Sequence, residues 1–322
     1  MKISGSRVLL TGASGFIGSH VARACVRDGA EVTCLSRPGS DLCRLLDEGK
    51  SVRSIEVDMA DAGAVKEAVA SANPHIIFHL AANTNRKRDL SLYGEMHAAH
   101  VKPTLNLISA ALSLSTVPRF VHTGTIEEYG RGPVPYREDQ FAQPISPYSL
   151  TKYEATELVL FAAREYGLSA MVLRPSLTYG PMKGRGMFIP DFLHAALTTK
   201  VFDMSPGEQT RDFIHVDDMA RAHLIAAEAD GVSGEICNVA TGVETKLKDV
   251  AEILRVFSGG DVVVNYGAYP CDPNKETMRC FMDIKKINDR LSWKPSISLN
   301  DGLASTAEWY LKSSTSFERL WV

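Results

Sequence analysis

The sequence has no long apolar run, no excess of charge of one sign and no clustered cysteines. No stretch of about 18 apolar residues is present to cross a bilayer, and the N-terminal residues lack the apolar segment of a secretory signal. The 35 basic and 38 acidic residues give a net charge of -3, which argues against a nucleic-acid partner. The six cysteines form no Cys-x-x-Cys pair and have no histidine at zinc spacing, which argues against a metal site. We therefore expect a cytoplasmic protein with reduced thiols and no membrane contact.

What the sequence does contain is a regular alternation of short apolar runs with longer helical patterns over its first half. The runs are rich in Val, Ile and Leu, as strands buried in a parallel sheet are. Strands are expected at Arg7 to Leu10, Glu31 to Leu35, Val52 to Val57, Ile76 to Leu80, Arg119 to Thr123 and Ser169 to Leu173. Helices are expected at Gly15 to Arg27, Ala62 to Ser71, Tyr93 to Ser113 and Tyr148 to Tyr166, the last opened by Ser146-Pro147. This order predicts an α/β fold with a doubly wound parallel sheet.

The turn after the first predicted strand carries three regularly spaced glycines, Gly12, Gly15 and Gly18. Glycine permits a tight turn and a close approach of the backbone to a phosphate, and the N–H groups of the helix that follows, including those of Phe16 and Ile17, face the anion. A merely glycine-rich turn is the alternative. Its place in the first strand–turn–helix unit favours a Rossmann-type dinucleotide site.

The regular alternation of strand and helix patterns ends at about residue 175. Beyond it, loops rich in Gly and Pro separate shorter elements, which predicts a smaller second lobe. The segments from Phe213 to Val216 and from Ile236 to Val239 still have the pattern of buried strands, so the chain is expected to return to the sheet. We predict a cofactor-binding Rossmann domain of residues 1–175 plus roughly 213–240. Residues 176–212 and 241–322 would form a smaller C-terminal α/β substrate lobe.

The second predicted strand ends at Ser36-Arg37, where a site for NAD usually has an acid on the ribose 2′-hydroxyl. Arg37 offers a fixed cation with several donors, which suits the 2′-phosphate of NADP. A solvated loop arginine is the alternative, and Asp41 is still near enough to reach a ribose. NADP(H) is therefore expected to be favoured, with NAD(H) possible.

Tyr148 and Lys152 lie four residues apart on one helical face, so a phenol and an ammonium can act together. The ammonium is expected to bring the phenol pKa of about 10 closer to neutrality, so that Tyr148 exchanges a proton with a carbinol or carbonyl oxygen. The spacing alone is common by chance. Here it follows a dinucleotide turn and a strand end bearing hydroxyls, Thr123-Gly124-Thr125.

With these motifs the sequence resembles the extended short-chain dehydrogenase/reductase family, in its NAD(P)-dependent epimerase/dehydratase branch that acts on nucleotide-diphosphate sugars. The resemblance covers nearly the whole chain. Beyond the glycine turn and the Tyr148/Lys152 pair, it includes Val57-Asp58-Met59, His79-Leu80-Ala81-Ala82, Glu128-Tyr129-Gly130, the segment from Gly207 to Asp218, and Ser292-Trp293-Lys294-Pro295.

The resemblance implies a role for each matching residue. Thr125, Tyr148 and Lys152 match the catalytic residues, and Thr125 would hydrogen-bond the reacting sugar oxygen. Glu127 would touch the sugar and Arg211 would clamp the substrate diphosphate. The structural alternatives are a strand-end threonine, a glutamate capping a turn, and a salt bridge from Arg211 to Asp212 or Asp217. The residues expected at the cofactor are Gly12, Gly15, Phe16, Ile17, Gly18, Ser36, Arg37, Asp58, Met59, Leu80, Ala81, Ala82, Tyr148, Lys152 and Pro175.

The sequence departs from the family at positions that bear on the substrate. Ile126 stands where dehydratases of the family have the acid of Thr-Asp-Glu, so sugar 4,6-dehydration is not expected. His100 and Leu177 stand where asparagines are common, and Pro273 stands where a second phosphate-binding arginine is common. The sequence thus defines the substrate-binding residues less well than the cofactor-binding residues.

The stretch from Tyr266 to Met278, and on to Trp293, looks most like reductases of the 4-keto group of nucleotide-linked deoxysugars. This agrees with Arg37, because a net reductase draws on NADPH. We therefore expect an NADPH-dependent 4-ketoreductase, a homodimer by analogy with relatives that pair through the helices at Tyr93 to Ser113 and Tyr148 to Tyr166. A 4-epimerase would use the same residues. A decarboxylase of a nucleotide-linked uronic acid is a further alternative, but the sequence has no persuasive arginine to bind the carboxylate. An NADP-sensing protein without turnover is the alternative of another class, although such proteins typically lose the Tyr/Lys pair.

Overall fold

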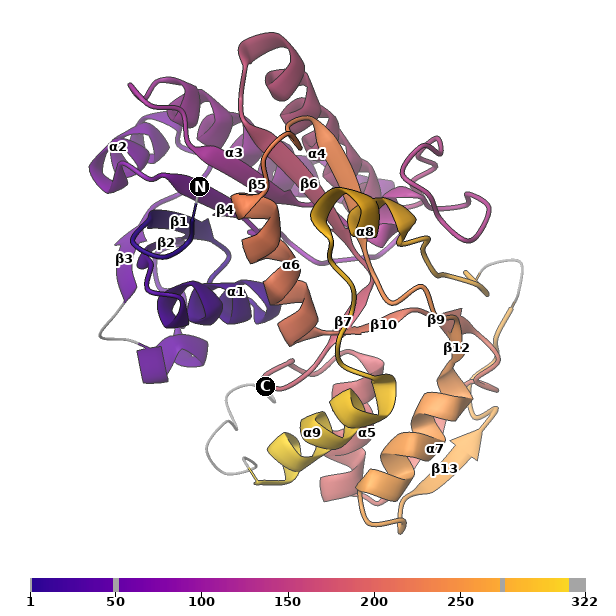
Figure 1. The fold of residues 1–322 in the computed structure, drawn as a ribbon. Helices are drawn as coiled ribbons and strands as arrows, with labels where there is room; N and C mark the ends of the chain where they lie inside the picture. Colours follow the sequence, from indigo (N-terminus) through magenta and orange to yellow (C-terminus); the bar gives the residue numbers. More distant parts are fainter. Residues whose placement is uncertain (1, 49–51, 273–275, 313–322) are drawn as a thin grey trace.

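A seven-stranded parallel sheet forms the centre of the larger lobe (Figure 1). The computed structural model describes residues 2–48, 52–272 and 276–312. Every neighbouring pair of strands in the sheet is parallel. The strand order is β11 (Glu235–Val239), β6 (Ala170–Pro175), β5 (Arg119–Thr123), β4 (Ile76–His79), β1 (Arg7–Thr11), β2 (Glu31–Ser36) and β3 (Val52–Glu56). The predicted α/β fold with a Rossmann-type sheet is confirmed.

Helices cover both faces of this sheet because successive residues of each strand point to opposite sides. Val8 and Leu10 pack in one core cluster, whereas Leu9 between them packs in the other. The first cluster includes residues of α1 (Phe16–Arg27), α6 (Val216–Glu228) and α8 (Lys285–Leu291). The second includes residues of α2 (Ala62–Ala72), α3 (Tyr93–Leu112) and α4 (Pro147–Tyr166).

Local sequence sets the start of α4, the helix that carries Tyr148. The Ser146 hydroxyl accepts a hydrogen bond from the backbone N–H of Ser149, and Pro147 occupies the first turn, as predicted. Gly167, at φ 70°, ends the helix in the left-handed conformation. These caps hold Tyr148 in the first turn of the helix, at the carboxyl edge of the sheet.

The smaller lobe packs three helices with short strand pairs around its own core. Its helices are α5 (Phe188–Leu197), α7 (Leu247–Phe257) and α9 (Leu299–Lys312). The strand pairs are β7 (Leu177–Tyr179) with β10 (Phe213–His215), β9 (Thr210–Arg211) with β12 (Thr245–Lys246), and β8 (Val201–Met204) with β13 (Val263–Tyr266). Short 3-10 turns occur at η1 (Cys43–Glu48), η2 (Leu90–Leu92) and η3 (Ile126–Glu128). In the described ranges no helix has the length and apolar character needed to span a bilayer.

One predicted strand has a different partner from the one expected. β11 joins the main sheet beside β6, but β10 pairs in parallel with β7, so the prediction that the segment from Phe213 to Val216 returns to the main sheet is wrong. The pattern of buried residues identifies a strand and not its partner. β7 follows directly after β6 and takes up β10, with the first contact running from the N–H of Leu177 to the carbonyl of Asp212. The domain boundaries stay a prediction.

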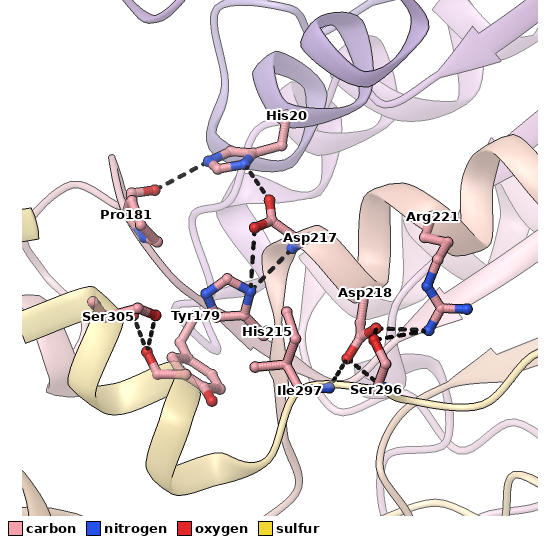
Figure 2. Close-up of polar contacts among 12 residues, drawn as sticks. His20, Tyr179, Pro181, His215, Asp217, Asp218, Arg221, Ser296, Ile297 and Ser305 are labelled. Carbon is pink, nitrogen blue, oxygen red and sulfur yellow. Dashed lines mark hydrogen bonds and ion pairs between the residues drawn. The ribbon is translucent and has the colours of Figure 1, made fainter. Parts of the chain in front are cut away.

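A polar junction ties α1 to α6 and to the loop that follows β7 (Figure 2). His20 of α1 lies 3.2 Å from an Asp217 carboxylate oxygen and 3.1 Å from the carbonyl oxygen of Pro181. Both partners are hydrogen-bond acceptors, and each lies against a different ring nitrogen of His20. The next residue of the loop, Met182, accepts a hydrogen bond from Arg44, which also donates to the carbonyl of Ser14. The Pro181–Lys183 loop is therefore fastened to the glycine turn and its helix.

Candidate active site

The glycine turn between β1 and α1 is packed too tightly for a side chain at Gly12 or Gly18. Gly12 has φ 80°, and a Cβ there would lie 2.7 Å from the backbone nitrogen of Ala81. A Cβ on Gly18 would lie 2.1 Å from the Gly12 carbonyl oxygen. Gly15 is the N-cap of α1 and offers no side-chain cap to the first turn, which begins with Phe16 and Ile17. Free N–H groups at a helix N-terminus above a turn of bare backbone fit the diphosphate of a dinucleotide.

The predicted cofactor residues gather around this turn at the carboxyl edge of the sheet. The N–H groups of Leu80 and Ala81 both donate to the Thr11 hydroxyl, which fixes the end of β4 against the end of β1. Leu80, Ala82 and Pro175 line the main cavity of the protein together with Ile17. This is where the strand order reverses between β1 and β4, the usual place for a ligand in such sheets.

The residues at the ends of β2 and β3 are a second group. The Ser36 hydroxyl lies 3.2 Å from that of Ser54. Arg37 is exposed, and its guanidinium has no hydrogen bond or ion pair to the rest of the described chain, although its carbonyl accepts from the Ser40 N–H. The carboxylates of Asp41 and Asp58 both accept from nearby backbone N–H groups. Met59 is buried and its carbonyl accepts from the Asn106 amide. Arg37 therefore has its guanidinium free for an external anion.

Thr125, Tyr148 and Lys152 line one open cavity of about 360 Å³, so the structure brings the three predicted catalytic residues together. The side chains of Tyr148 and Lys152 are 5% and 3% exposed. The Lys152 ammonium donates to the carbonyl of Thr123 at 2.6 Å, and burial lowers its pKa to about 8. The Thr123 carbonyl thus fixes the ammonium one helical turn from the phenol.

The expected effect of Lys152 on Tyr148 is not what the structure shows. Burial raises the pKa of Tyr148, so the prediction that the phenol approaches neutrality is wrong. The groups that act in the opposite direction are the Arg86 guanidinium and the hydroxyl of Thr125. The Lys152 ammonium itself donates to the Thr123 carbonyl.

Two adjacent glutamates, Glu127 and Glu128, differ in which of the two proposed roles they can fill: contact with the sugar or capping of a turn. Glu127 lines the cavity and forms an ion pair with Arg86, Nε to Oε1 2.8 Å, and burial raises its pKa. Glu128 points inward instead: it accepts from the Thr125 backbone N–H at 2.8 Å and pairs with Arg174 at 2.8 Å. The turn-capping glutamate is therefore Glu128, which leaves Glu127 for the cavity.

Arg211 of β9 also lines the cavity. Its Nη1 donates to the carbonyls of Thr210 and Thr277 at 2.7 and 2.9 Å. Asp212 accepts from Thr241 and the Gly242 N–H instead, and Asp217 pairs with His20. The salt-bridge alternative for Arg211 is thus wrong for the described part of the chain, and the guanidinium has donors left for an anion.

Sequence reasoning missed several charged residues of the cavity. Arg86 and Arg88 come from the loop after β4, Lys183 from the Pro181–Lys183 loop, and Glu276 from the smaller lobe. The Lys183 ammonium lies 4.6 Å from the centre of the Phe16 ring. The basic run Asn85-Arg86-Lys87-Arg88, in the loop that follows β4, was a signal that could have identified the first two.

The four noted departures have separate outcomes, and Ile126 lines the cavity. His100 is buried in α3 and hydrogen-bonds the Thr151 hydroxyl at 2.8 Å, with its ring edge-on to Tyr148. Leu177 lines the cavity. Pro273 lies outside the described residues.

Comparisons with known proteins agree on one group of enzymes. The model of the NAD dependent epimerase/dehydratase family matches residues 8–240. A trifunctional UDP-glucose 4,6-dehydratase/UDP-4-keto-6-deoxy-D-glucose 3,5-epimerase/UDP-4-keto-L-rhamnose-reductase of Arabidopsis thaliana is 28% identical over 317 residues, 95% of this chain and 47% of the relative. The chain thus spans about half the length of that plant enzyme.

Two solved structures are similar over almost their full length. UDP-glucose 4-epimerase of Thermotoga maritima, solved with UDP-glucose, has a TM-score of 0.87 and 28% identity, covering 95% of this chain and 99% of that one. The dTDP-glucose 4,6-dehydratase DesIV of Streptomyces venezuelae, solved with NAD bound, has a TM-score of 0.86 and 26% identity, covering 97% and 99%.

Proposed function

Because this chain belongs to the NAD dependent epimerase/dehydratase family, a group of oxidoreductase-type enzymes, we propose that it reduces the 4-keto group of a nucleotide-diphosphate-linked deoxysugar with NADPH. The observation that carries the direction is the exposed guanidinium of Arg37 after β2, which suits the 2′-phosphate of NADPH, the cofactor that a net reductase consumes. Tyr148 would donate its proton to the carbonyl oxygen, as reduction requires.

The cofactor would lie along the carboxyl edge of the sheet. The N–H groups of Phe16 and Ile17, above the bare turn at Gly12, would hold its diphosphate, and the free guanidinium of Arg37 would pair with a 2′-phosphate. Lys152, fixed by the Thr123 carbonyl, would hydrogen-bond the nicotinamide ribose. A nicotinamide dinucleotide supplies a hydride when it is bound.

The substrate would lie in the cavity between the lobes. Arg211, whose Nη1 is fixed by two carbonyls, would bind the diphosphate through its remaining N–H groups. The Thr125 hydroxyl would hold the sugar carbonyl oxygen while Tyr148 transfers its proton to that oxygen. Glu127 would accept a hydrogen bond from a sugar hydroxyl. Ile126, whose side chain has no proton to give, argues against loss of a sugar hydroxyl as water.

A 4-epimerase is the second candidate, favoured by the similarity to the Thermotoga maritima epimerase over 95% of this chain. It would use Thr125, Tyr148 and Lys152 in both directions. The sequence separates the two reactions only through Arg37 and the reductase-like stretch from Tyr266 to Met278.

Cofactor stoichiometry distinguishes the two reactions. We expect the loss of one NADPH for each molecule of a 4-keto-6-deoxy sugar nucleotide reduced, followed by absorbance and by mass spectrometry of the product. We expect no interconversion of UDP-glucose with UDP-galactose, or of the corresponding uronic acids. Catalytic interconversion of either pair without added cofactor would overturn the reductase and establish the epimerase.

A further inference from the structure

We propose that Arg86 is a positioning residue for Tyr148: its guanidinium, held over the phenol ring by Glu127, stabilises the negative charge that remains when the phenol gives up its proton. The inference deepens the proposed function and rests on the role of Tyr148 as the proton donor. It assigns a role to Arg86, which belongs neither to the glycine turn nor to the Tyr148/Lys152 motif.

Three contacts from different elements hold the Arg86 side chain. Its Nε lies 2.8 Å from Oε1 of Glu127 in η3, and its Nη1 lies 3.8 Å from the sulfur of Met187, the N-cap of α5. Its Cζ lies 5.9 Å from the centre of the Tyr148 ring. All four residues line the same cavity. The guanidinium is therefore placed over the ring by a residue of each lobe, although it comes from a loop.

The other polar groups around Tyr148 come from three elements. His100 of α3 meets the ring edge-on at 5.6 Å, but burial lowers its pKa to about 3, so it is neutral. Lys152 of α4 is a second buried cation, and its ammonium donates to the Thr123 carbonyl. The two acids of η3, Glu127 and Glu128, both raise the pKa of Tyr148, whereas the Thr125 hydroxyl lowers it. Arg86 is the cation that lies over the phenol ring in the described chain.

Arg86 and Glu127 therefore act on Tyr148 with opposite signs although they form one ion pair. Removing the charge of Arg86 leaves the phenolate beside an acid, which favours the protonated phenol. Removing the charge of Glu127 leaves it beside a cation, which favours the phenolate. A merely structural pair would behave differently, because breaking it from either side disturbs the same packing and would move Tyr148 in one direction.

The test is the ionisation of Tyr148 in Arg86→Gln and Glu127→Gln, read from tyrosinate ultraviolet absorbance directly after a pH jump, before unfolding. The chain has 10 tyrosines, so each variant is compared with the same variant carrying Tyr148→Phe. A unit charge about 6 Å away is expected to shift the pKa by about half a unit to two units, upward for Arg86→Gln and downward for Glu127→Gln. Arg86→Lys, which keeps the charge, is expected to restore most of the wild-type titration.

Lys87→Gln is the matched control, because it removes one positive charge from the same exposed loop. Equal shifts in Lys87→Gln and Arg86→Gln would overturn the proposal, as would shifts of the same sign in Arg86→Gln and Glu127→Gln. If Arg86→Gln does not fold, the sign of the Glu127→Gln shift decides. The titration needs neither substrate nor cofactor. Opposite shifts in a protein that reduces no keto sugar would therefore refute the proposed function and leave the electrostatic role of Arg86 intact.

Discussion

Glu128→Gln is expected to destabilise the protein much more than the same substitution one residue earlier. The Glu128 side chain is fully buried and that of Arg174 is 3% exposed. Besides the ion pair, Glu128 accepts from the Thr125 backbone N–H and from the Thr156 hydroxyl. Glutamine keeps the shape but removes the charge, so Arg174 is left as an uncompensated cation in the interior. Breaking a buried pair from one side costs about 3 to 5 kcal/mol of the free energy of unfolding.

Urea unfolding followed by tryptophan fluorescence measures this cost as a shift of the midpoint at unchanged slope. Glu127→Gln is the matched control: Glu127 is 28% exposed and its partner Arg86 is 42% exposed, so we expect a loss of about 1 kcal/mol or less. Replacing both partners, Glu128→Gln with Arg174→Met, is expected to recover part of the loss because the unpaired charge is gone. A Glu128→Gln protein within about 1 kcal/mol of the wild type would refute the reasoning.

Three further predictions concern the cofactor edge and the catalytic pair. Arg37→Gln is expected to weaken NADPH binding by roughly tenfold to a hundredfold and NADH binding little, since a charge-assisted contact contributes about 1.5 to 3 kcal/mol; equal titration of both cofactors by the wild type would contradict it. Tyr148→Phe is expected to fold and bind cofactor but to lose most turnover. Lys152→Met is expected to lose turnover and, in addition, to bind the cofactor more weakly than the wild type. Near-wild-type turnover in Tyr148→Phe would place the proton donor elsewhere. The pKa of Lys152 in the folded protein, about 8, lies below its ordinary value of 10.5. The unfolded chain therefore binds more protons than the folded protein between pH 8 and pH 10.5. The stability of the wild type relative to Lys152→Met should rise with pH across that window. Urea midpoints of the two proteins from pH 7 to about 11 test this, and a flat difference would show that the lysine is not desolvated.

Sequence motifs predicted the parts of the site that local geometry defines. The glycine turn needs backbone without side chains at Gly12 and Gly18, and Tyr148 and Lys152 share a helix that Ser146 and Pro147 begin, so short-range spacing is enough. The segments that form the seven strands of the main sheet were all predicted as strands, but their order in the sheet was not predicted. The strand at Phe213 was placed in the wrong sheet, because its burial pattern is the same beside β7 as beside β6.

The parts that could not be predicted depend on which way a side chain points and on contacts between distant segments. Glu127 and Glu128 look alike in the sequence, and only the turn of η3 sends one into the cavity and the other to Arg174. Arg86 reaches Tyr148 across 62 positions of the chain, and Lys183 reaches Phe16 from the other lobe. The pKa of Tyr148 was predicted in the wrong direction because burial, which a motif does not encode, outweighs the nearby Arg86 guanidinium and the Thr125 hydroxyl.

The fastening of the Pro181–Lys183 loop has a thermodynamic consequence. His20 and Arg44 connect that loop to the helix and turn proposed to hold the cofactor diphosphate, while Lys183 of the same loop lines the cavity proposed for the sugar. A ligand that favours this position of the loop through one of its ends also favours the contacts made through the other. Cofactor and sugar nucleotide should therefore bind cooperatively, and linkage requires each to tighten the other by the same factor whichever binds first.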